Sequence, residues 1–482
     1  MKKLFFLFSL LPLLVSAQIS FSPQSLGFEE RAYGSIDYAT DPDANEYIIM
    51  TGFTEFNVAT DIIIAKTSLY MRSGTGSWVE VSTPFIDVAQ SSALFVDLNG
   101  DGYPDVFITG DVCTNSVCHE EMKIYINNQD GTFTESSQSF PVALRKVNGF
   151  TADLNNDGRK DVVFIGVDGG SVPYTLVYRN NGDGTVTEMA TNLPDVGYGY
   201  LSVGPFVTDD FSGPSNPNQA IIITGYDGGA TRYFHVYENL GNFNFSLVNS
   251  FVGLSSSSHV LADFNGDGVN DIIAFGANSN VGAIQSKMYI GDGLGNFTVS
   301  TLSSPSPDVG VIVLAYDVDN DGDLDLYLFG ADTDGENNAK VYENAGDGTF
   351  SLAYTFPDEV IGASAVLFDS NSDGIKDLLY QGDSSALLFS APLVSYQENT
   401  STLGVIDFGY SSFNVYPNPT SGAVFIDIDR EVKEIKVLNS LGQEVFVSRE
   451  RNFNIDHLTA GLYYVRILAE DGSIETQKLI KN

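Results

Sequence analysis

The chain has 482 residues, with 62 Asp and Glu against 23 Lys and Arg, and a formal net charge of −39. Such an acidic excess argues against nucleic acid or an anionic membrane as a partner, because phosphate binding relies on clustered Lys and Arg. Divalent cations are the more natural counter-charge. The length predicts two or three domains.

Residues 1–18 predict a secretory signal peptide. Lys2 and Lys3 form a basic start, residues 4–15 are apolar, and Ser16 and Ala17 supply small residues suited to cleavage. No later segment has the roughly 20 uninterrupted apolar residues that a transmembrane helix needs. We therefore expect an exported chain without a transmembrane segment.

A glycine follows a short apolar segment seven times between residues 30 and 390. Each unit contains four expected strands, with Gly- and Asp-containing hairpin turns such as 130–133 and 347–350. Four strands per unit make one blade of a β-propeller, so residues 19–396 are predicted to form seven blades, a ring that leaves no exposed sheet edge. The repeated glycines are Gly52, Gly110, Gly166, Gly225, Gly276, Gly330 and Gly382.

The segment 19–23 resembles the expected fourth strands 133–137 and 297–300. It is predicted to pair with the last blade and close the ring, although residues 393–396 compete for the same place.

Two cysteines, Cys113 and Cys118, lie in the second unit. Passage through an oxidising compartment favours a local disulfide between them over two free thiols. Zinc is less favoured, because no histidine pairs with them at ligand spacing beyond the adjacent His119.

Five units carry a nine-residue loop between their first two strands. Oxygen donors occupy positions 1, 3, 5 and 9, glycine occupies position 6, and position 7 offers its backbone carbonyl. The predicted ligands are Asp97, Asn99, Asp101, Tyr103 and Asp105; Asp153, Asn155, Asp157, Arg159 and Asp161; Asp263, Asn265, Asp267, Val269 and Asp271; Asp317, Asp319, Asp321, Asp323 and Asp325; and Asp369, Asn371, Asp373, Ile375 and Asp377.

This pattern suits Ca²⁺, which takes six to eight oxygen ligands in flexible geometry, better than Mg²⁺, which prefers a rigid octahedron. Asp, Asn and Gly are also common in ordinary turns. Five loops in register, each beginning 13 residues before the repeated glycine, favour about five structural calcium ions. The corresponding segments 37–46 and 209–218 lack the glycine, and there we expect the fold without the metal.

After an expected linker at 397–412, residues 413–482 show short alternating strands at 424–428, 435–438 and 463–467, separated by glycine turns. Their spacing predicts a small β-sandwich.

The metal loops, with Phe275-Gly276 and Phe329-Gly330 after them, resemble the FG-GAP repeat of integrin alpha propellers and the related bacterial VCBS repeat. The resemblance covers about residues 30–390. It implies a seven-bladed propeller with calcium in loops on one rim, and the segments 37–46 and 209–218 depart from it.

The C-terminal segment carries a second resemblance, through the motifs at 416–422, 438–445 and 458–465 and the basic ending at 478–481. These motifs are similar to the type A sorting domain of type IX secretion substrates, a family known from Bacteroidota. It implies an Ig-like sandwich, engagement of the type IX machinery through residues 413–482, and release or attachment at the outer-membrane surface.

The sequence thus predicts an all-β protein, a seven-bladed β-propeller followed by a small Ig-like β-sandwich. The favoured function is a secreted or cell-surface binding or adhesion protein with structural calcium and an unidentified protein or glycan ligand. The alternative is an extracellular polysaccharide hydrolase or lyase. The sequence shows no recognisable Ser-His-Asp triad, which argues against the alternative, whereas a glycosidase carboxylate pair could lie among the many acidic residues.

Overall fold

The computed structural model describes residues 19–57, 62–74, 76–114, 117–197, 199–205, 219–229, 231–278, 283–300, 302, 304–305, 308–332, 337–384, 391–401, 413–428, 432–439, 444–469 and 474–482. Throughout these residues the regular structure consists of strands. The chain divides into two compact units, one formed by Ile19–Ser401 and one that contains Thr402–Asn482. The predicted all-β class is confirmed.

Five four-stranded antiparallel sheets follow one another along the first unit, each with its strands in chain order. Their strands are β2 (Ile36–Thr40), β3 (Asn45–Asn57), β4 (Ile62–Ser73) and β5 (Val79–Val81); β6 (Ala89–Val96), β7 (Asp105–Thr114), β8 (Val117–Asn127) and β9 (Phe133–Glu135); β10 (Arg145–Ala152), β11 (Asp161–Val167), β12 (Pro173–Asn180) and β13 (Val186–Met189); β14 (Leu201–Pro205), β15 (Gln219–Tyr226), β16 (Arg232–Asn239) and β17 (Phe245–Ser250); and β18 (Ser255–Ala262), β19 (Asp271–Asn278), β20 (Ala283–Gly291) and β21 (Phe297–Ser300).

A seven-stranded sheet completes the unit, in the order β22 (Asp308–Tyr316), β23 (Asp325–Asp332), β24 (Asn337–Asn344), β25 (Phe350–Phe368), β26 (Asp377–Asp383), β27 (Pro392–Asn399) and β1 (Phe21–Gln24). The long strand β25 pairs with β24 mainly through residues 350–355 and with β26 through residues 361–368. Strand β1 pairs with β27, which confirms the expected pairing of the N-terminal segment with the last repeat. Residues 393–396 do not take its place, because they belong to β27, which lies between β1 and β26 in the sheet.

The repeated glycines lie in β3, β7, β11, β15, β19, β23 and β26. Opposite five of them, Gly110, Gly166, Gly276, Gly330 and Gly382, the register of the preceding strand shifts in a bulge. A side chain at Gly110 would place its Cβ 2.4 Å from the Cβ of Ser91, and one at Gly382 would lie 2.8 Å from the Cβ of Val360. The register of β6 against β7 shifts between Ala89 and Ser92, opposite Gly110. Glycine is required there because a bulge brings the two strands too close for any larger residue.

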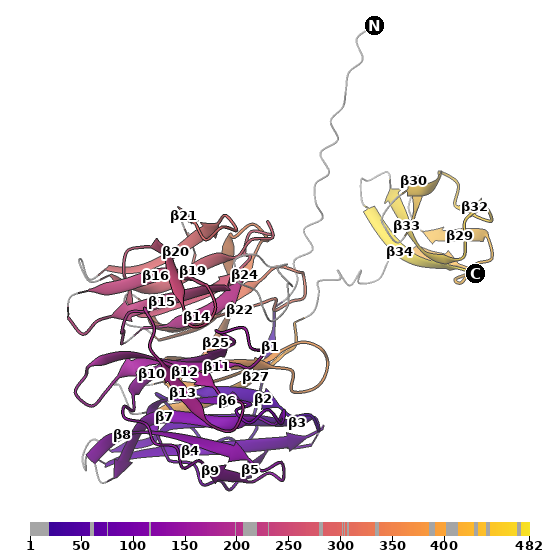
Figure 1. Ribbon diagram of the computed structural model, residues 1–482. Helices are drawn as coiled ribbons and strands as arrows, with labels where there is room; N and C mark the ends of the chain where they lie inside the picture. The colour runs from indigo at the N-terminus through magenta and orange to yellow at the C-terminus, as the bar shows by residue number, and fades with distance from the viewer. Residues whose placement is uncertain are drawn as a thin grey trace. The chain divides into compact units, whose positions relative to one another are not determined.

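The first and last sheets of the unit are neighbours. The backbone N–H of Ile36 donates to the hydroxyl of Ser364 at 2.9 Å, and the Gln381 amide donates to the carbonyl of Thr51 at 2.9 Å. One buried cluster combines Ile48 of β3 with Leu379 of β26. Figure 1 shows the indigo strands β2 and β3 beside β27 accordingly.

The second unit contains a three-stranded sheet, β28 (Phe413–Tyr416), β29 (Ala423–Ile428) and β32 (Asn452–Asn454), and a four-stranded sheet in the order β31 (Glu444–Ser448), β30 (Val432–Asn439), β33 (Gly461–Ala469) and β34 (Ile474–Lys481). Buried residues of both sheets, among them Val424 and Val465, form one core.

Several predictions from the sequence fall on residues outside the described part: the signal peptide at 1–18, the departing segment at 209–218 and most of the linker, 402–412. At the linker's start, β27 continues to Asn399, because residues 397–399 pair with β1 and β26 rather than leaving the sheet at 396. Cys113 and Cys118 form the expected disulfide across the β7–β8 hairpin.

Candidate metal loops and a neighbouring pocket

The five acidic loops join β6 to β7, β10 to β11, β18 to β19, β22 to β23 and β25 to β26. Each loop has left-handed backbone at two positions. At position 6, which is glycine in all five loops, the φ angle runs from 84° to 101°, and position 4 is left-handed as well. Position 4 is occupied by Gly100, Asn156, Gly266, Asn320 and Ser372. Glycine and asparagine tolerate this conformation best, and that constraint at position 4 was missed from the sequence.

The carboxylate at position 1 accepts hydrogen bonds from backbone N–H groups of its own loop. In the first loop, one oxygen of Asp97 accepts the N–H of Gly100 at 2.7 Å, and the other accepts the N–H of Gly102 at 2.9 Å. Asp101 at position 5 in turn accepts the N–H of Tyr103 at 2.8 Å. The N–H of position 6 also donates to the position 1 carboxylate in the other four loops. The five loops therefore share one backbone path.

The buried carboxylate at position 9 closes each loop onto its sheet. One oxygen of Asp105 accepts the N–H of Leu98 at 2.9 Å, and the other accepts the N–H of Asn127 at the end of the third strand at 2.8 Å. The other four loops repeat both bonds. Since an ionised carboxylate has about four acceptor sites, these bonds leave capacity for a cation.

Buried asparagines attach the loops to the following sheet. The amide of Asn180 donates to the carbonyl of Asp97 at 2.8 Å, and that of Asn344 donates to the carbonyl of Phe264 at 2.9 Å. Within the seven-stranded sheet, Asn399 at the end of β27 likewise donates to the carbonyl of Val318 in the loop between β22 and β23, at 2.9 Å. The path of one loop is thus coupled to the position of the next sheet.

The loop 317–325 brings three carboxylates together. Ligand oxygens of Asp317, Asp319 and Asp325 lie within 4.8 Å of one another, a group that could hold a metal ion. Oδ2 of Asp319 is buried and has no hydrogen-bond partner. A buried carboxylate oxygen without a donor is costly unless a cation compensates it, so this donor set fits a hard cation.

Burial raises the pKa of four position 9 carboxylates, those of Asp105, Asp161, Asp271 and Asp325. Burial, assisted by the neighbouring Asp101 and Asp97, raises the pKa of Asp105 to about 7. Burial and the adjacent Asp319 and Asp321 raise the pKa of Asp325 to about 8. Neighbouring like charges and desolvation both disfavour the charged form, and a bound cation would reverse both effects.

The turn at 41–44 between β2 and β3 is closed by hydrogen bonds to the carboxylate of Asp41. Asp41 accepts hydrogen bonds from the N–H groups of Asp43 and Asn45 and from the side chains of Asn45 and Tyr47, at 2.8 to 2.9 Å. Burial opposes ionisation here, but these donors outweigh it and lower the pKa of Asp41. The expectation of a fold without a metal in segment 37–46 remains a prediction.

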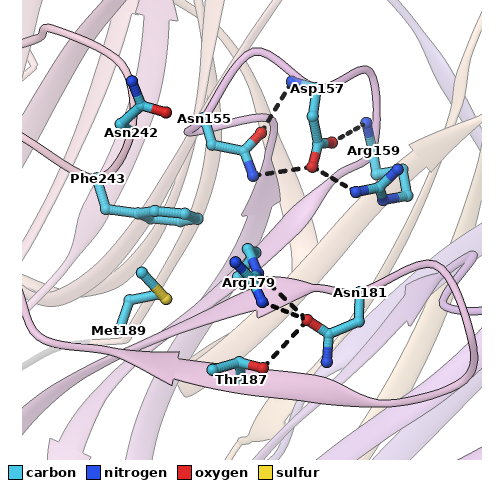
Figure 2. A pocket seen from close by; sticks show the side chains of 9 residues that line it. All are labelled: Asn155, Asp157, Arg159, Arg179, Asn181, Thr187, Met189, Asn242 and Phe243. Atoms are coloured by element: carbon cyan, nitrogen blue, oxygen red, sulfur yellow. Dashed lines mark hydrogen bonds and ion pairs between the residues drawn. The ribbon is translucent and has the colours of Figure 1, made fainter.

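A pocket of about 600 Å³ lies beside the second loop, between the sheet β10–β13 and the turn that follows β16 (Figure 2). Figure 2 shows three groups around it: loop residues above, strand residues below, and the turn at one side. The lining residues are Asn155, Asp157, Arg159, Arg179, Asn181, Thr187, Met189, Asn242 and Phe243. The sequence assigned Asn155, Asp157 and Arg159 only to metal binding and did not indicate the pocket.

The chain matches two family models. The FG-GAP-like repeat matches residues 97–164, 153–213, 263–328 and 317–380, and the secretion system C-terminal sorting domain matches residues 414–482. The chain therefore carries FG-GAP-like repeats and a type IX sorting domain. This sorting domain engages the type IX secretion machinery, which delivers the protein to the cell surface or releases it. A search of curated proteins found no match.

Among solved structures, similar chains include a fungal alcohol oxidase of the AA5 family in complex with copper, at 11% identity and a TM-score of 0.47, covering 96% of this chain and 99% of that one. A protein of unknown function from Dyadobacter fermentans matches at 11% identity and a TM-score of 0.39, covering 79% and 97%. AofleA from Arthrobotrys oligospora matches at 10% identity and 0.37, covering 70% and 90%. Likeness at this level carries no inference about function.

Among the described residues, no helix is long and apolar enough to cross a membrane.

Proposed function

We propose that this exported FG-GAP-like repeat protein is a seven-bladed β-propeller that structural calcium stabilises and that serves as a binding or adhesion protein at the cell surface or in the medium. The observation that carries the proposal is the common path of the five acidic loops, in each of which the position 1 carboxylate accepts the N–H of position 6, with three carboxylates converging in the loop 317–325.

The strand pairing supports a count of seven blades. Strand β25 serves as the fourth strand beside β24 and as the first strand beside β26, so the seven-stranded sheet divides into two four-stranded blades. Together with the five separate sheets these make seven. The hydrogen bonds from Ile36 to Ser364 and from Gln381 to Thr51 link the first blade to the last, as a closed ring requires.

The donor chemistry supports calcium. Carboxylate and amide oxygens at positions 1, 3, 5 and 9 and the carbonyl at position 7 are hard ligands of the kind Ca²⁺ takes in flexible loops. In loop 317–325 these would be Asp317, Asp319, Asp321 and Asp325 with the carbonyl of Asp323. When bound, the ion would supply the positive charge that these buried and crowded carboxylates lack.

A structural role follows from the place of the loops. Each loop lies at the end of a blade, and asparagines such as Asn180 and Asn344 join it to the next blade. A cation that fixes the loop would therefore also fix the contact between blades. Binding would be left to surface loops and pockets, since loops on a rigid scaffold commonly carry recognition. In the second unit, we propose an Ig-like sandwich as the sorting domain.

Calcium counting in matched variants tests this proposal. The full chain is saturated with calcium, freed of excess ion and assayed by elemental analysis, alone and as Asp101→Ala with Asp267→Ala. About five ions are expected for the unchanged chain and about two fewer for the double variant. As a control, Asp130→Ala removes a carboxylate from a hairpin turn outside the loops and should leave the count unchanged. An equal count in all three proteins would refute the loop assignment.

A further inference from the structure

The pocket beside the loop 153–161 contains an arrangement of basic residues that the other blades lack. Arg179 is the next-to-last residue of the third strand β12, and Arg159 occupies position 7 of the loop. The matching strand residues elsewhere are Arg72, Ile126, Glu238, Ile290, Glu343 and Glu398, and the matching loop residues are Tyr103, Val269, Asp323 and Ile375. Arg72 forms an ion pair with Glu46. Among the described residues, this is the one repeat in which both of these positions are arginine.

The two arginines are held differently. Nη2 of Arg159 donates to a carboxylate oxygen of Asp157 at 2.5 Å, and its Nε donates to the carbonyl of Asn180 at 3.2 Å. Nε and Nη2 of Arg179 both donate to Oδ1 of Asn181, at 3.2 and 3.0 Å, and no carboxylate of the described residues pairs with it. Arg179 therefore brings a full positive charge to the pocket.

The position of Arg179 is fixed before any ligand arrives. Oδ1 of Asn181 also accepts the hydroxyl of Thr187 at 3.1 Å, and the Asn181 amide donates to Thr185 at 2.9 Å. This network uses two of the five N–H donors of the guanidinium and leaves three for a ligand. A pre-oriented planar fork favours carboxylate or sulfate oxygens, because less side-chain entropy is lost on binding.

The rest of the lining suits a sugar. The amide of Asn242 can donate to and accept from hydroxyl groups, whereas that of Asn155 is engaged by Asp157 within the loop. Phe243 and Met189 form an apolar side; Phe243 is buried in the core between the two blades, and Met189 packs against the same core. A volume of about 600 Å³ is many times that of a small inorganic anion and falls in the range of organic ligand sites.

The protein's overall negative charge does not prevent an anion from binding here. At physiological ionic strength charges farther away than about 8 Å are largely screened, so the local groups decide. Within the pocket the carboxylate is that of Asp157, and its charge is already shared with Arg159.

We propose that this pocket binds an acidic saccharide, a sugar with a carboxylate or sulfate group, and that Arg179 holds the anionic group while the amide of Asn242 binds hydroxyls. The inference rests on the proposed role as a binding protein and names its ligand class. Its test can be separated from the calcium count, because Arg179, Asn181 and Thr187 lie on strands and turns outside the metal loop, whose residues Asn155, Asp157 and Arg159 line the other side of the pocket.

Titration calorimetry on the full chain tests this inference. The protein is loaded with calcium and desalted, so that free calcium does not bridge carboxylates, and trigalacturonate, a sulfated trisaccharide and neutral maltotriose are titrated separately. We expect binding of at least one acidic trisaccharide and a weaker signal or none for maltotriose. The two acidic probes distinguish a uronate from a sulfated ligand.

Three variants assign the binding to the pocket. Arg179→Met removes the charge and should weaken binding about tenfold to a hundredfold, the usual loss for a hydrogen bond to a charged group. Arg179→Lys keeps the positive charge but lacks the planar guanidinium, so its affinity for the acidic sugar should lie between those of the unchanged chain and Arg179→Met. Lys123→Met removes a surface charge that pairs with Glu135 outside the pocket, and should bind within about twofold of the unchanged chain.

Bound calcium is counted in every sample. An unchanged count with lost sugar binding in Arg179→Met supports the pocket. Equal binding of maltotriose, no binding of either acidic probe, or unaltered affinity in Arg179→Met would overturn the inference whatever the count. A chain that binds the acidic sugar but holds no calcium would contradict the proposed calcium role and leave the pocket standing.

Discussion

Replacement of Phe21 by alanine tests the closing strand. The Phe21 ring is buried in the last sheet, with centroid distances of 4.8 Å to Phe356, 5.0 Å to Tyr354 and 6.1 Å to Tyr327. Phe→Ala in a core costs about 3 to 5 kcal/mol, from lost burial and the cavity left behind. At about 2.1 cal/mol/K per residue, a unit of roughly 380 residues has an unfolding entropy near 0.8 kcal/mol/K. The expected fall in melting temperature is therefore about 4 to 6 °C.

Differential scanning calorimetry of the full chain measures this fall, with Gln24→Ala as the control. Gln24 lies on the same strand, but its side chain is exposed and makes hydrogen bonds of 3.2 and 3.4 Å to Ser22 and Glu398. The control should melt within about 1 °C of the unchanged chain, as is usual for surface substitutions. If Phe21→Ala melts with the control, β1 does not close the ring.

Three further perturbations follow from other contacts. Asn344→Ala removes a buried amide that donates to the carbonyls of Phe264 and Leu324, and should lower the free energy of unfolding by about 1 to 3 kcal/mol. Urea unfolding measures this loss, with a substitution of the exposed Asn296, Asn296→Ala, as the control. Equal losses in the two variants would contradict the coupling between blades. Reduction of the Cys113–Cys118 disulfide, which closes a short loop, should cost about 2 kcal/mol; a melting temperature unchanged by reductant would count against this. Burial raises the pKa of Asp37 to about 6, above its unfolded value, so the stability it contributes is complete below the unfolded pKa and is lost as the pH rises through 6. Asp37→Asn should therefore gain stability relative to the unchanged chain between pH 5 and 7.5, and a pH-independent difference would argue against a buried charge there.

The sequence predicted the repeated architecture because its signals are local. The seven glycines, the acidic loops and the Gly-Asp hairpins each lie within a few residues of the structure they determine. The sequence could not show why glycine is needed at these positions, because the need arises from a bulge in another strand, such as the one that brings Ser91 against Gly110. The left-handed position 4 was also missed, because asparagine and serine there read equally well as turn residues.

The pocket could not be predicted because it is formed across blades. Arg179 and Phe243 are far apart in sequence and meet only when the turn after β16 packs beside β12 and β13. Arg159 was interpreted through its backbone carbonyl alone, which left its side chain without a role. The comparison with the matching positions of other blades is the signal that could have indicated it.

The most direct test of the account is thermal unfolding of the full chain in excess EDTA and in calcium, with bound metal counted in the same samples. At a free calcium 100 times the dissociation constant, each site would contribute about 2.7 kcal/mol. Five sites would raise the melting temperature by roughly 17 °C at the unfolding entropy used above. A large calcium-dependent rise with about five ions per chain is the predicted result. An unchanged melting temperature with no bound metal would contradict the account, and the acidic loops would then be turns alone.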